Sequence, residues 1–292
     1  MSAIGLKKVL VTGLNSYIGT SFKKWVEKHH ESKAILVETI DIKSEGWKEK
    51  DFSVYDVVYH VAGIAHIKET TRNTSLYFKV NRDLTIELAQ KAKNSGVKQF
   101  IFLSSMSVYG VEHGMIFRDT VPNPQSSYGI SKLQAEEQIM KLKDDKFKVA
   151  TVRPPMVYGE NCKGNYPRLA SFALKFPVFP DVNNKRSMIY IDNLSKFVSL
   201  LINDEAEGVY TPQNKEYVNT SELVRNISDI HGKRVKIIKS FNIIINFLVN
   251  KSSTLNKMFG DLIYDSNISS YKSEYCVVDF KESVKRSEGY GE

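Results

Sequence analysis

The sequence predicts an α/β protein with a doubly wound parallel sheet and a smaller C-terminal lobe. In the first half of the chain, short and continuously apolar segments alternate with longer segments of helical period. This alternation is typical of a parallel sheet that is covered by helices on both faces. A glycine-containing turn follows the first apolar segment, and the alternation becomes irregular after Arg153-Pro154-Pro155. The 292 residues are enough for one domain with an added lobe.

Each expected element follows from a local pattern. The strands are short apolar runs, and the long second helix repeats Leu76, Val80, Leu84 and Leu88 close to helical spacing until Gly96 ends it. The predicted strands are 7–12, 34–40, 55–61, 99–103 and 148–152, and the predicted helices are 17–29, 75–94, 128–143 and 192–202. We expect a first domain of residues 1–159 plus 185–205, and a lobe of residues 160–184 plus 206–292.

Composition and charge exclude several classes of protein. Charged residues at 25% and apolar residues at 42% are typical of a globular protein. The net charge of +8 comes from scattered lysines, so we expect no nucleic-acid partner but a mild attraction for anionic metabolites. Cys162 and Cys276 have no metal-ligand spacing, which predicts no metal site and fits a reducing, cytoplasmic compartment. No signal peptide is evident, and the apolar stretch 241–249 is too short for membrane insertion.

The segment from Val11 to Gly19 (VTGLNSYIG) lies between the first strand and the first helix. Backbone N–H groups at such a helix N-terminus can bind a pyrophosphate. Asp41 comes 22 residues after Gly19, at the end of the second strand. A carboxylate there accepts hydrogen bonds from ribose hydroxyls and repels a 2′-phosphate, which favours NAD over NADP. Lys43 nearby weakens that preference, so NADP stays open as an alternative.

Tyr128 and Lys132 are spaced as i and i+4 at the start of a long helical segment. The two side chains then share one helix face, where an ammonium would stabilise a phenolate and lower the pKa of Tyr128. A phenol with a lowered pKa can act as an acid or base at neutral pH. The same spacing also fits a surface helix with no chemistry.

The motifs together resemble the extended short-chain dehydrogenases/reductases, in particular nucleotide-sugar enzymes of the NAD-dependent epimerase/dehydratase family. The resemblance covers nearly the whole chain and implies a Rossmann-type fold for the first domain. It rests on the Thr12–Gly19 turn, Asp51-Phe52, His60-Val61-Ala62-Gly63, Asn81, Ser104-Ser105-Met106-Ser107-Val108-Tyr109-Gly110, Tyr128-x-x-x-Lys132, Arg153-Pro154-Pro155-Met156-Val157-Tyr158-Gly159 and Arg186-Ser187-Met188-Ile189-Tyr190-Ile191-Asp192.

The resemblance implies a role for each matching residue. Ser105 orients the reacting sugar oxygen, Tyr128 is the acid–base residue, and Lys132 lowers its pKa and binds the nicotinamide ribose. The implied cofactor-binding residues are Gly13, Asn15, Ser16, Tyr17, Ile18, Gly19, Asp41, Ile42, Asp51, Phe52, Val61, Ala62, Gly63, Asn81, Ser104, Tyr128, Lys132 and Pro155. The implied substrate-binding residues are Ser105, Met106, Tyr128, Asn165, Val178, Phe179 and Arg186, with Asn165 and Arg186 on the diphosphate and Val178-Phe179 against uracil.

Departures from the family pattern narrow the expected reaction. Met106 and Ser107 stand where 4,6-dehydratases of the family have an Asp-Glu pair, so dehydration is not expected. Ser16 replaces the middle glycine of the turn, which puts tight retention of the cofactor in doubt, and Met156 replaces an asparagine of galactose-pathway 4-epimerases.

The resemblance favours 4-keto reduction of a UDP-2-acetamido-2,6-dideoxy-4-hexulose for surface polysaccharide synthesis. A UDP-hexose 4-epimerase, acting on UDP-glucose or UDP-N-acetylglucosamine, is the first alternative. The alternative of another class is a non-catalytic Rossmann-type dinucleotide sensor, although such proteins commonly lose the tyrosine–lysine pair. A homodimer through the helices near 75–94 and 125–143 would be typical of the family.

Overall fold

The computed structural model describes residues 5–29, 34–65, 69–70, 72–239 and 259–291. The chain divides into two compact units: unit 1 comprises residues 1–110, 121–154 and 194–212, and unit 2 comprises residues 111–120, 155–193 and 213–292. This division differs from the expected one in four segments: residues 111–120, 155–159 and 185–193 belong to unit 2, and residues 206–212 belong to unit 1. The apolar stretch 241–249 lies outside the described residues. In the described part, no helix is long and apolar enough to cross a membrane.

Unit 1 is an α/β layer structure, as the sequence predicts. Its sheet has six parallel strands in the order β10-β6-β4-β3-β1-β2. The strands are β1 (Lys7–Thr12), β2 (Ile35–Ile40), β3 (Val57–His60), β4 (Gln99–Leu103), β6 (Lys148–Val152) and β10 (Gly208–Tyr210). The helical elements are α1 (Tyr17–Lys28), η2 (Glu45–Lys48), α2 (Thr74–Tyr77), η3 (Phe78–Asp83), α3 (Leu84–Asn94), η4 (Met106–Tyr109), α4 (Ser127–Met140) and α6 (Ile191–Asn203), the last from residue 194 onward.

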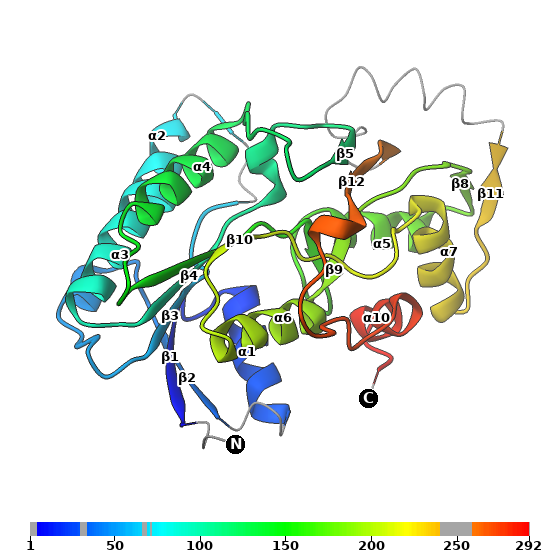
Figure 1. The fold of residues 1–292 in the computed structure, drawn as a ribbon. Coiled ribbons are helices and arrows are strands. Elements are labelled where there is room, and N and C mark those ends of the chain that lie inside the picture. The colour runs from blue at the N-terminus through cyan, green and yellow to red at the C-terminus, as the bar shows by residue number, and fades with distance from the viewer. Residues whose placement is uncertain (1–4, 30–33, 66–68, 71, 240–258, 292) are drawn as a thin grey trace. The chain divides into compact units, whose positions relative to one another are not determined.

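Helices cover both faces of this sheet, with α3 and α4 on one face and α1 and α6 on the other (Figure 1). On the α3–α4 face, Leu10, Val58, Phe100 and Val149 are in register across four neighbouring strands. They form a buried core with small and apolar side chains of α3 and α4, namely Leu88, Ala89, Ala92, Ala135 and Ile139. On the other face, the Phe22 ring of α1 packs edge-on against Tyr59 of β3 at 5.3 Å. The continuous apolar strands are therefore explained by burial on both sides.

The long helix predicted over 75–94 is interrupted. The segment η3 is a π-helix, in which the hydrogen bonds run from i to i+5. It separates the four-residue α2 from α3, and Asn81 within it is fully buried. Apolar spacing does not register such an extra residue, because the residues on either side keep a helical period.

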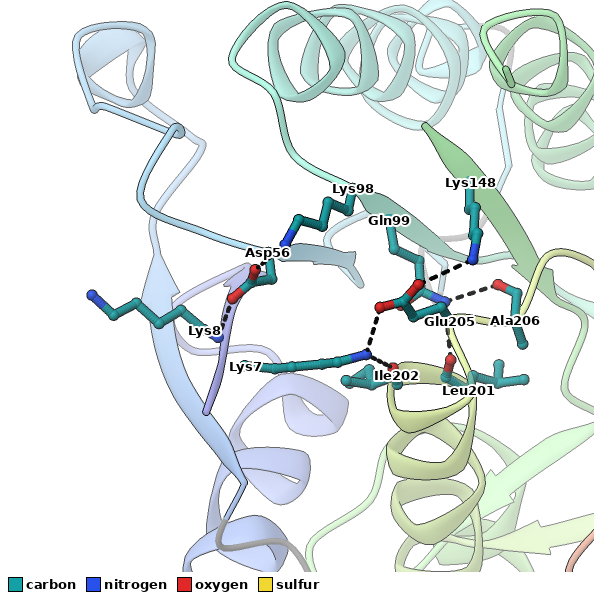
Figure 2. A network of polar contacts seen from close by, with 10 residues as sticks. All are labelled: Lys7, Lys8, Asp56, Lys98, Gln99, Lys148, Leu201, Ile202, Glu205 and Ala206. Carbon is teal, nitrogen blue, oxygen red and sulfur yellow. Dashed lines mark hydrogen bonds and ion pairs between the residues drawn. The ribbon is translucent and has the colours of Figure 1, made fainter. Parts of the chain in front are cut away.

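The amino-terminal ends of the strands form a network of charged side chains, shown in Figure 2. Glu205, which follows α6, accepts ion pairs from Lys7 of β1 at 3.1 Å and Lys148 of β6 at 3.0 Å. Asp56, just before β3, pairs with Lys98 at 3.1 Å. The Gln99 amide donates to the carbonyl oxygens of Leu201 and Ala206 at 3.0 and 2.8 Å, where α6 ends. We call Lys7, Asp56, Lys98, Gln99, Lys148 and Glu205 the amino-end network.

Among its described residues, unit 2 combines three helices with pairs of short parallel strands. The pairs are β5 (Gly114–Ile116) with β12 (Leu262–Tyr264), β7 (Met156–Tyr158) with β9 (Met188–Tyr190), and β8 (Val178–Pro180) with β11 (Lys236–Ile238). The helices are α5 (Asn165–Lys175), α7 (Thr220–Ile230) and α10 (Phe280–Ser287), with a short η6 (Ser266–Ile268). Buried Tyr158 holds this unit together, because its hydroxyl bonds to Ser283 at 2.5 Å and to Asn214 at 2.9 Å.

Candidate active site

The turn between β1 and α1 allows close approach to the backbone. Gly13 has a φ of +92°, which favours glycine. A Cβ on Gly19 would lie 2.6 Å from Ser16 Oγ and 3.0 Å from Val11 Cγ1, so glycine is also required there. Ser16 caps α1, because its Oγ accepts a hydrogen bond from the Gly19 N–H at 3.1 Å. The N-terminus of α1 is suited to a pyrophosphate, but Ser16 already occupies one of its N–H donors.

Asp41 lies beside this turn, since Gly13 N–H donates to the carbonyl of Ile40 at 2.8 Å. The Asp41 side chain is exposed and accepts the N–H of Lys43 at 3.0 Å. Ile42, in contrast, is buried. The position of Asp41 at the carboxyl end of β2 fits the expected ribose contact. Asn15 is exposed in the turn, and Tyr17 and Ile18 are half-buried.

Asp51 and Phe52 have different environments. The exposed Asp51 carboxylate accepts the Ser53 N–H at 2.8 Å, and the hydrogen bonds from Ser53 lower its pKa. The Phe52 ring is fully buried in the core near Trp47, at 6.5 Å between ring centroids. Its side chain is therefore a core residue and is not available to stack on an adenine, which limits the expected contact to its backbone.

Ser105 and Tyr128 come together because η4 and α4 approach closely. A Cβ on Gly129 would lie 2.6 Å from the Ser107 carbonyl oxygen, so the residue after Tyr128 must be glycine. Ser105 caps η4, where its Oγ accepts the Ser107 N–H at 3.1 Å. The Ser105 Oγ donates to Ser107 Oγ at 3.1 Å. Its interaction with the Tyr128 phenol favours the phenolate, but burial outweighs this effect and raises the pKa of Tyr128.

Lys132 lies one helical turn further along α4 and is buried, whereas Tyr128 is partly exposed. Its Nζ donates to the carbonyl of Leu103 at 2.8 Å and lies 4.5 Å from the centroid of the Phe102 ring. Burial lowers the pKa of Lys132 to about 7. The expected lowering of the Tyr128 pKa by Lys132 is not present in this structure, in which burial of the phenol dominates.

Asn81 connects the loop after β3 with the helix that bears Tyr128. Its Oδ1 accepts the Ile64 N–H at 2.9 Å, while its Nδ2 donates to the Ile64 carbonyl at 3.0 Å and to Ser131 Oγ at 3.3 Å. A Cβ on Gly63 would lie 2.9 Å from Asn81 Oδ1 and 3.4 Å from Lys132 Nζ. Asn81, Gly63 and Lys132 are thus neighbours at the carboxyl end of the sheet.

A dinucleotide fits these residues. The glycines at 13, 19 and 63 keep the backbone open where Cβ atoms would intrude. Val61 is buried, and its Cγ2 would lie 3.1 Å from a Cβ on Gly19, while Ala62 is half-buried beside Gly13. In the described part of the chain the buried Ser104 hydroxyl has no protein partner, which leaves a polar atom for a bound ligand.

The residues expected to bind the rest of the substrate belong to unit 2. Asn165 begins α5, Val178 is 37% exposed, and the buried Phe179 ring packs 5.8 Å from Phe259. Arg186 donates to the Gly260 carbonyl at 2.7 Å. Burial lowers its pKa to about 10 against the opposing charge of Asp261. Unit 2 also includes Pro155, whereas Met106 is a buried residue of unit 1.

Several residues around the site were given no role from the sequence, although His60 and Arg153 lie in the motifs quoted above. Glu69 accepts the Ser127 N–H at 3.1 Å and the Ser127 hydroxyl, which anchors the first residue of α4. Glu136, on the same helix face as Lys132, forms a buried ion pair with Arg153 at 2.5 Å. His60 is fully buried between threonine hydroxyls. His60 could have been noticed as a polar residue that ends an otherwise apolar strand. Glu69 lies in a loop, where no sequence pattern points to it.

The fold and the glycine-containing turn are typical of enzymes that bind a nicotinamide dinucleotide. The model of the NAD dependent epimerase/dehydratase family matches residues 9–214, and the chain belongs to this family. It is therefore an enzyme, an epimerase or a reductase, of an NAD-dependent family.

Three relatives illustrate the range of the family. The chain is 33% identical to a UDP-glucose 4-epimerase of Vibrio cholerae over 247 residues, which cover 76% of this chain and 75% of the relative. It is 25% identical to a GDP-6-deoxy-D-mannose reductase of Pseudomonas aeruginosa, over 80% of this chain and 83% of the relative. The structure of a UDP-glucuronic acid 4-epimerase from Bacillus cereus in complex with NAD superposes with a TM-score of 0.73, at 21% identity, over 97% of this chain and 98% of that one.

Proposed function

We propose that the protein is an NAD(P)H-dependent reductase of the C4 ketone of a UDP-sugar. The observation behind this proposal is the pairing of Ser105 with the Tyr128 phenol, with buried Lys132 on the same helix. Next to Ser105 stand Met106 and Ser107, neither of which is an acid or base at neutral pH. The site therefore has the groups to move one proton to or from one oxygen, and positions 106 and 107 supply no second acid–base pair for dehydration.

The residues divide the work of reduction. NAD(P)H, when bound, would supply the hydride for the carbonyl carbon. Tyr128 gives its phenolic proton to the oxygen that becomes negative, and Ser105 donates a hydrogen bond that orients this oxygen. Lys132 offsets the charge left on the phenolate, which is worth most in a buried site. The carbonyl thus gains one hydride and one proton and becomes a hydroxyl.

Ser16 favours reduction over epimerisation. A 4-epimerase oxidises and reduces the same sugar and benefits from keeping its NAD, whereas a reductase exchanges NADH for NAD in every cycle. With the Ser16 Oγ bonded to the Gly19 N–H, the pyrophosphate has one fewer donor at the helix N-terminus. Weaker retention of the dinucleotide suits a cosubstrate that leaves after each turnover.

The proposed substrate is a UDP-2-acetamido-2,6-dideoxy-4-hexulose for surface polysaccharide synthesis. The support is the resemblance of the second half of the chain, in particular segments 153–159, 164–169, 179–194 and 259–265, to reductases of such sugars. Asn165 and Arg186 would bind the diphosphate and Val178-Phe179 the uracil. The buried Arg186 guanidinium, whose pKa of about 10 keeps it charged at neutral pH, is a suitable partner for phosphate oxygens.

A UDP-hexose 4-epimerase is the second candidate, favoured by the 33% identity to the Vibrio cholerae enzyme of that name. It would use Tyr128, Ser105 and Lys132 in both directions. A non-catalytic dinucleotide sensor is the candidate of another class, and it would have no need for the Ser105–Tyr128 pair. We also propose a homodimer through α3 and α4, which would be typical of the family.

One experiment separates these candidates. Purified protein is assayed for bound NAD and for NAD(P)H consumption with UDP-2-acetamido-2,6-dideoxy-4-hexulose, and separately for interconversion of UDP-hexoses without added cofactor. Consumption of NAD(P)H only with the keto sugar supports the reductase, and interconversion with retained NAD contradicts it.

The Tyr128→Phe variant should lose roughly 10²–10⁴-fold in kcat. Tyr59→Phe is the matched control, since the described residues offer the buried Tyr59 hydroxyl no partner. If Tyr128→Phe and wild type had equal turnover, the catalytic role of Tyr128 would be wrong, and the non-catalytic dinucleotide sensor would remain as the candidate.

A further inference from the structure

His60 ends β3 in a row of residues that face α3 and α4. Thr12, His60, Phe102 and Thr151 are in register across β1, β3, β4 and β6, so their side chains point to the same face of the sheet. The His60 ring is fully buried and stacks on Phe102, with 5.7 Å between centroids. Both of its nitrogens are hydrogen-bonded: Nδ1 to Thr12 Oγ1 at 2.7 Å and Nε2 to Thr85 Oγ1 at 2.9 Å.

The hydrogen bonds around Thr85 determine the tautomer of His60. The Thr85 hydroxyl donates its single proton to the carbonyl of Asn81 at 2.8 Å. It must therefore accept from the imidazole, and Nε2 carries the ring proton. Nδ1 is then the acceptor, and the Thr12 hydroxyl donates to it. Thr12 Oγ1 in turn accepts the Ala62 N–H at 3.4 Å, a long contact that fits the same direction.

The resulting chain runs in one direction from the dinucleotide turn to the helix of Tyr128. It passes from the Ala62 N–H through the Thr12 hydroxyl to His60, and from His60 through the Thr85 hydroxyl to the Asn81 carbonyl. The Asn81 side chain continues it, since Nδ2 donates to Ser131 Oγ, and Ser131 Oγ donates to the Tyr128 carbonyl at 2.8 Å. Thr12 immediately precedes Gly13, so this chain of hydrogen bonds links the dinucleotide turn to the helix that carries Tyr128.

Only a neutral imidazole can complete this chain. Protonated His60 would have no acceptor for Thr12 and would face the charge of Lys132, which lies over the Phe102 ring. Burial first and the Lys132 charge second lower the pKa of His60 to about 3. The ring therefore stays neutral at physiological pH.

We propose that His60, as the neutral Nε2–H tautomer, is a positioning residue that aligns Asn81 and the Tyr128 helix with the dinucleotide turn. The proposal rests on the proposed function. His60 touches neither the sugar nor the reacting oxygen; it acts through Thr85 and Asn81. Loss of the Thr85 link should displace Tyr128 relative to the reacting carbonyl and lower kcat, with little change in KM for the sugar.

The test compares Thr85→Val with Thr85→Ser in the full-length enzyme. The valine keeps the shape of threonine but removes the hydroxyl, whereas serine keeps the hydroxyl. Thr151→Val is the matched control, because it removes a buried hydroxyl from the same row that has no partner among the described residues. We expect kcat to fall about tenfold in Thr85→Val and to stay within about twofold of wild type in the other two. All are assayed well below their melting temperatures, so unfolding does not contribute.

The tautomer is measured independently by the ¹⁵N chemical shifts of the His60 ring. Wild type should show a protonated Nε2 and an unprotonated Nδ1 from pH about 8 down to about 4. A protonated Nδ1, or equal kcat for the valine and serine variants at position 85, would overturn the proposal. Failure of the proposed function looks different: wild type would leave the keto sugar unreduced, while the ring shifts would still decide the tautomer.

Discussion

The two ends of the sheet in unit 1 differ in how the polar side chains near the strand termini are paired. At the carboxyl end, neutral side chains are buried and linked by directed hydrogen bonds from Thr12 through His60 to Thr85. At the amino end, the ionic side chains of the amino-end network are partly exposed, and Glu205 serves two lysines at once (Figure 2). Buried neutral bonds hold a geometry that a site requires, whereas exposed ion pairs are individually weak and replaceable.

The largest expected effect on activity comes from replacing Lys132, which lies at the carboxyl end of the sheet. Lys132→Met should lower kcat by at least about 10²-fold, since the charge that supports the phenolate is lost. It should also stabilise the protein by roughly 1–4 kcal/mol at pH 7, because a buried ammonium is removed. The lowered pKa means that wild-type stability rises between pH about 7 and the unfolded value of 10.5, and the variant should lack this rise. Urea titrations across that range measure it.

The matched variant at the other end is Lys148→Met, which should leave kcat unchanged. It breaks one ion pair with Glu205 at a partly exposed position. A loss of activity comparable to that of Lys132→Met would mean that the two ends are not functionally distinct.

Acid sensitivity provides the next test. His60 has a folded pKa below its unfolded value, so the unfolded chain binds more protons, and stability falls as the pH drops from about 6.5 toward 3. The slope from this one residue is up to about 1.4 kcal/mol per pH unit. Carboxylates of the amino-end network such as Glu205 have lowered pKa values, and their contribution is lost only below about 4.5. His60→Gln should therefore flatten the stability profile between pH about 6.5 and 4.5, measured by chemical unfolding; an unchanged slope would contradict the assignment.

Gln99 is the buried member of the amino-end network, and Gln99→Leu should cost about 1–3 kcal/mol with kcat unchanged. The variant removes two hydrogen bonds to the carbonyls that end α6. Part of the loss is offset, because the buried Gln99 Oε1 has no partner among the described residues. Thermal unfolding and the reductase assay on the same sample check both statements.

Glu205→Gln should have the smallest effect, a loss of stability of at most about 1 kcal/mol. The difference from wild type should vanish near 1 M salt, where the Debye length is about 3 Å. A loss that persisted at high salt would show that the amino-end network is not simply an exposed ionic one.

The sequence predicted the parallel sheet and the pair Tyr128–Lys132 because both depend on local periodicity. Apolar runs defined the strands of unit 1, and i,i+4 spacing put both side chains on one helix face. The close approach of Ser105 to Tyr128 depends on Gly129 lying against the Ser107 carbonyl, a contact that no local pattern indicates. Ser105 was predicted as a site residue only from the family resemblance, because its spacing from Tyr128 in the sequence does not indicate that the two are close.

The pKa of Tyr128 was predicted in the wrong direction for the structure as it stands. Spacing to a lysine says nothing of burial, and here burial of the phenol outweighs nearby charge. The short strands of unit 2, such as β8 and β11, were also missed, since three-residue strands have too few residues for a period.

The π-helix at Phe78–Asp83 constrains how this family member can vary. An α-helix turns about 100° per residue. Deleting one residue there would restore regular α-helical winding. If Asn81 kept its contacts, Thr85 would rotate away from His60. If Thr85 kept its contacts, Asn81 would rotate away from Ile64. An insertion or deletion in this segment would therefore have to be compensated within the same few residues for both sets of contacts to persist.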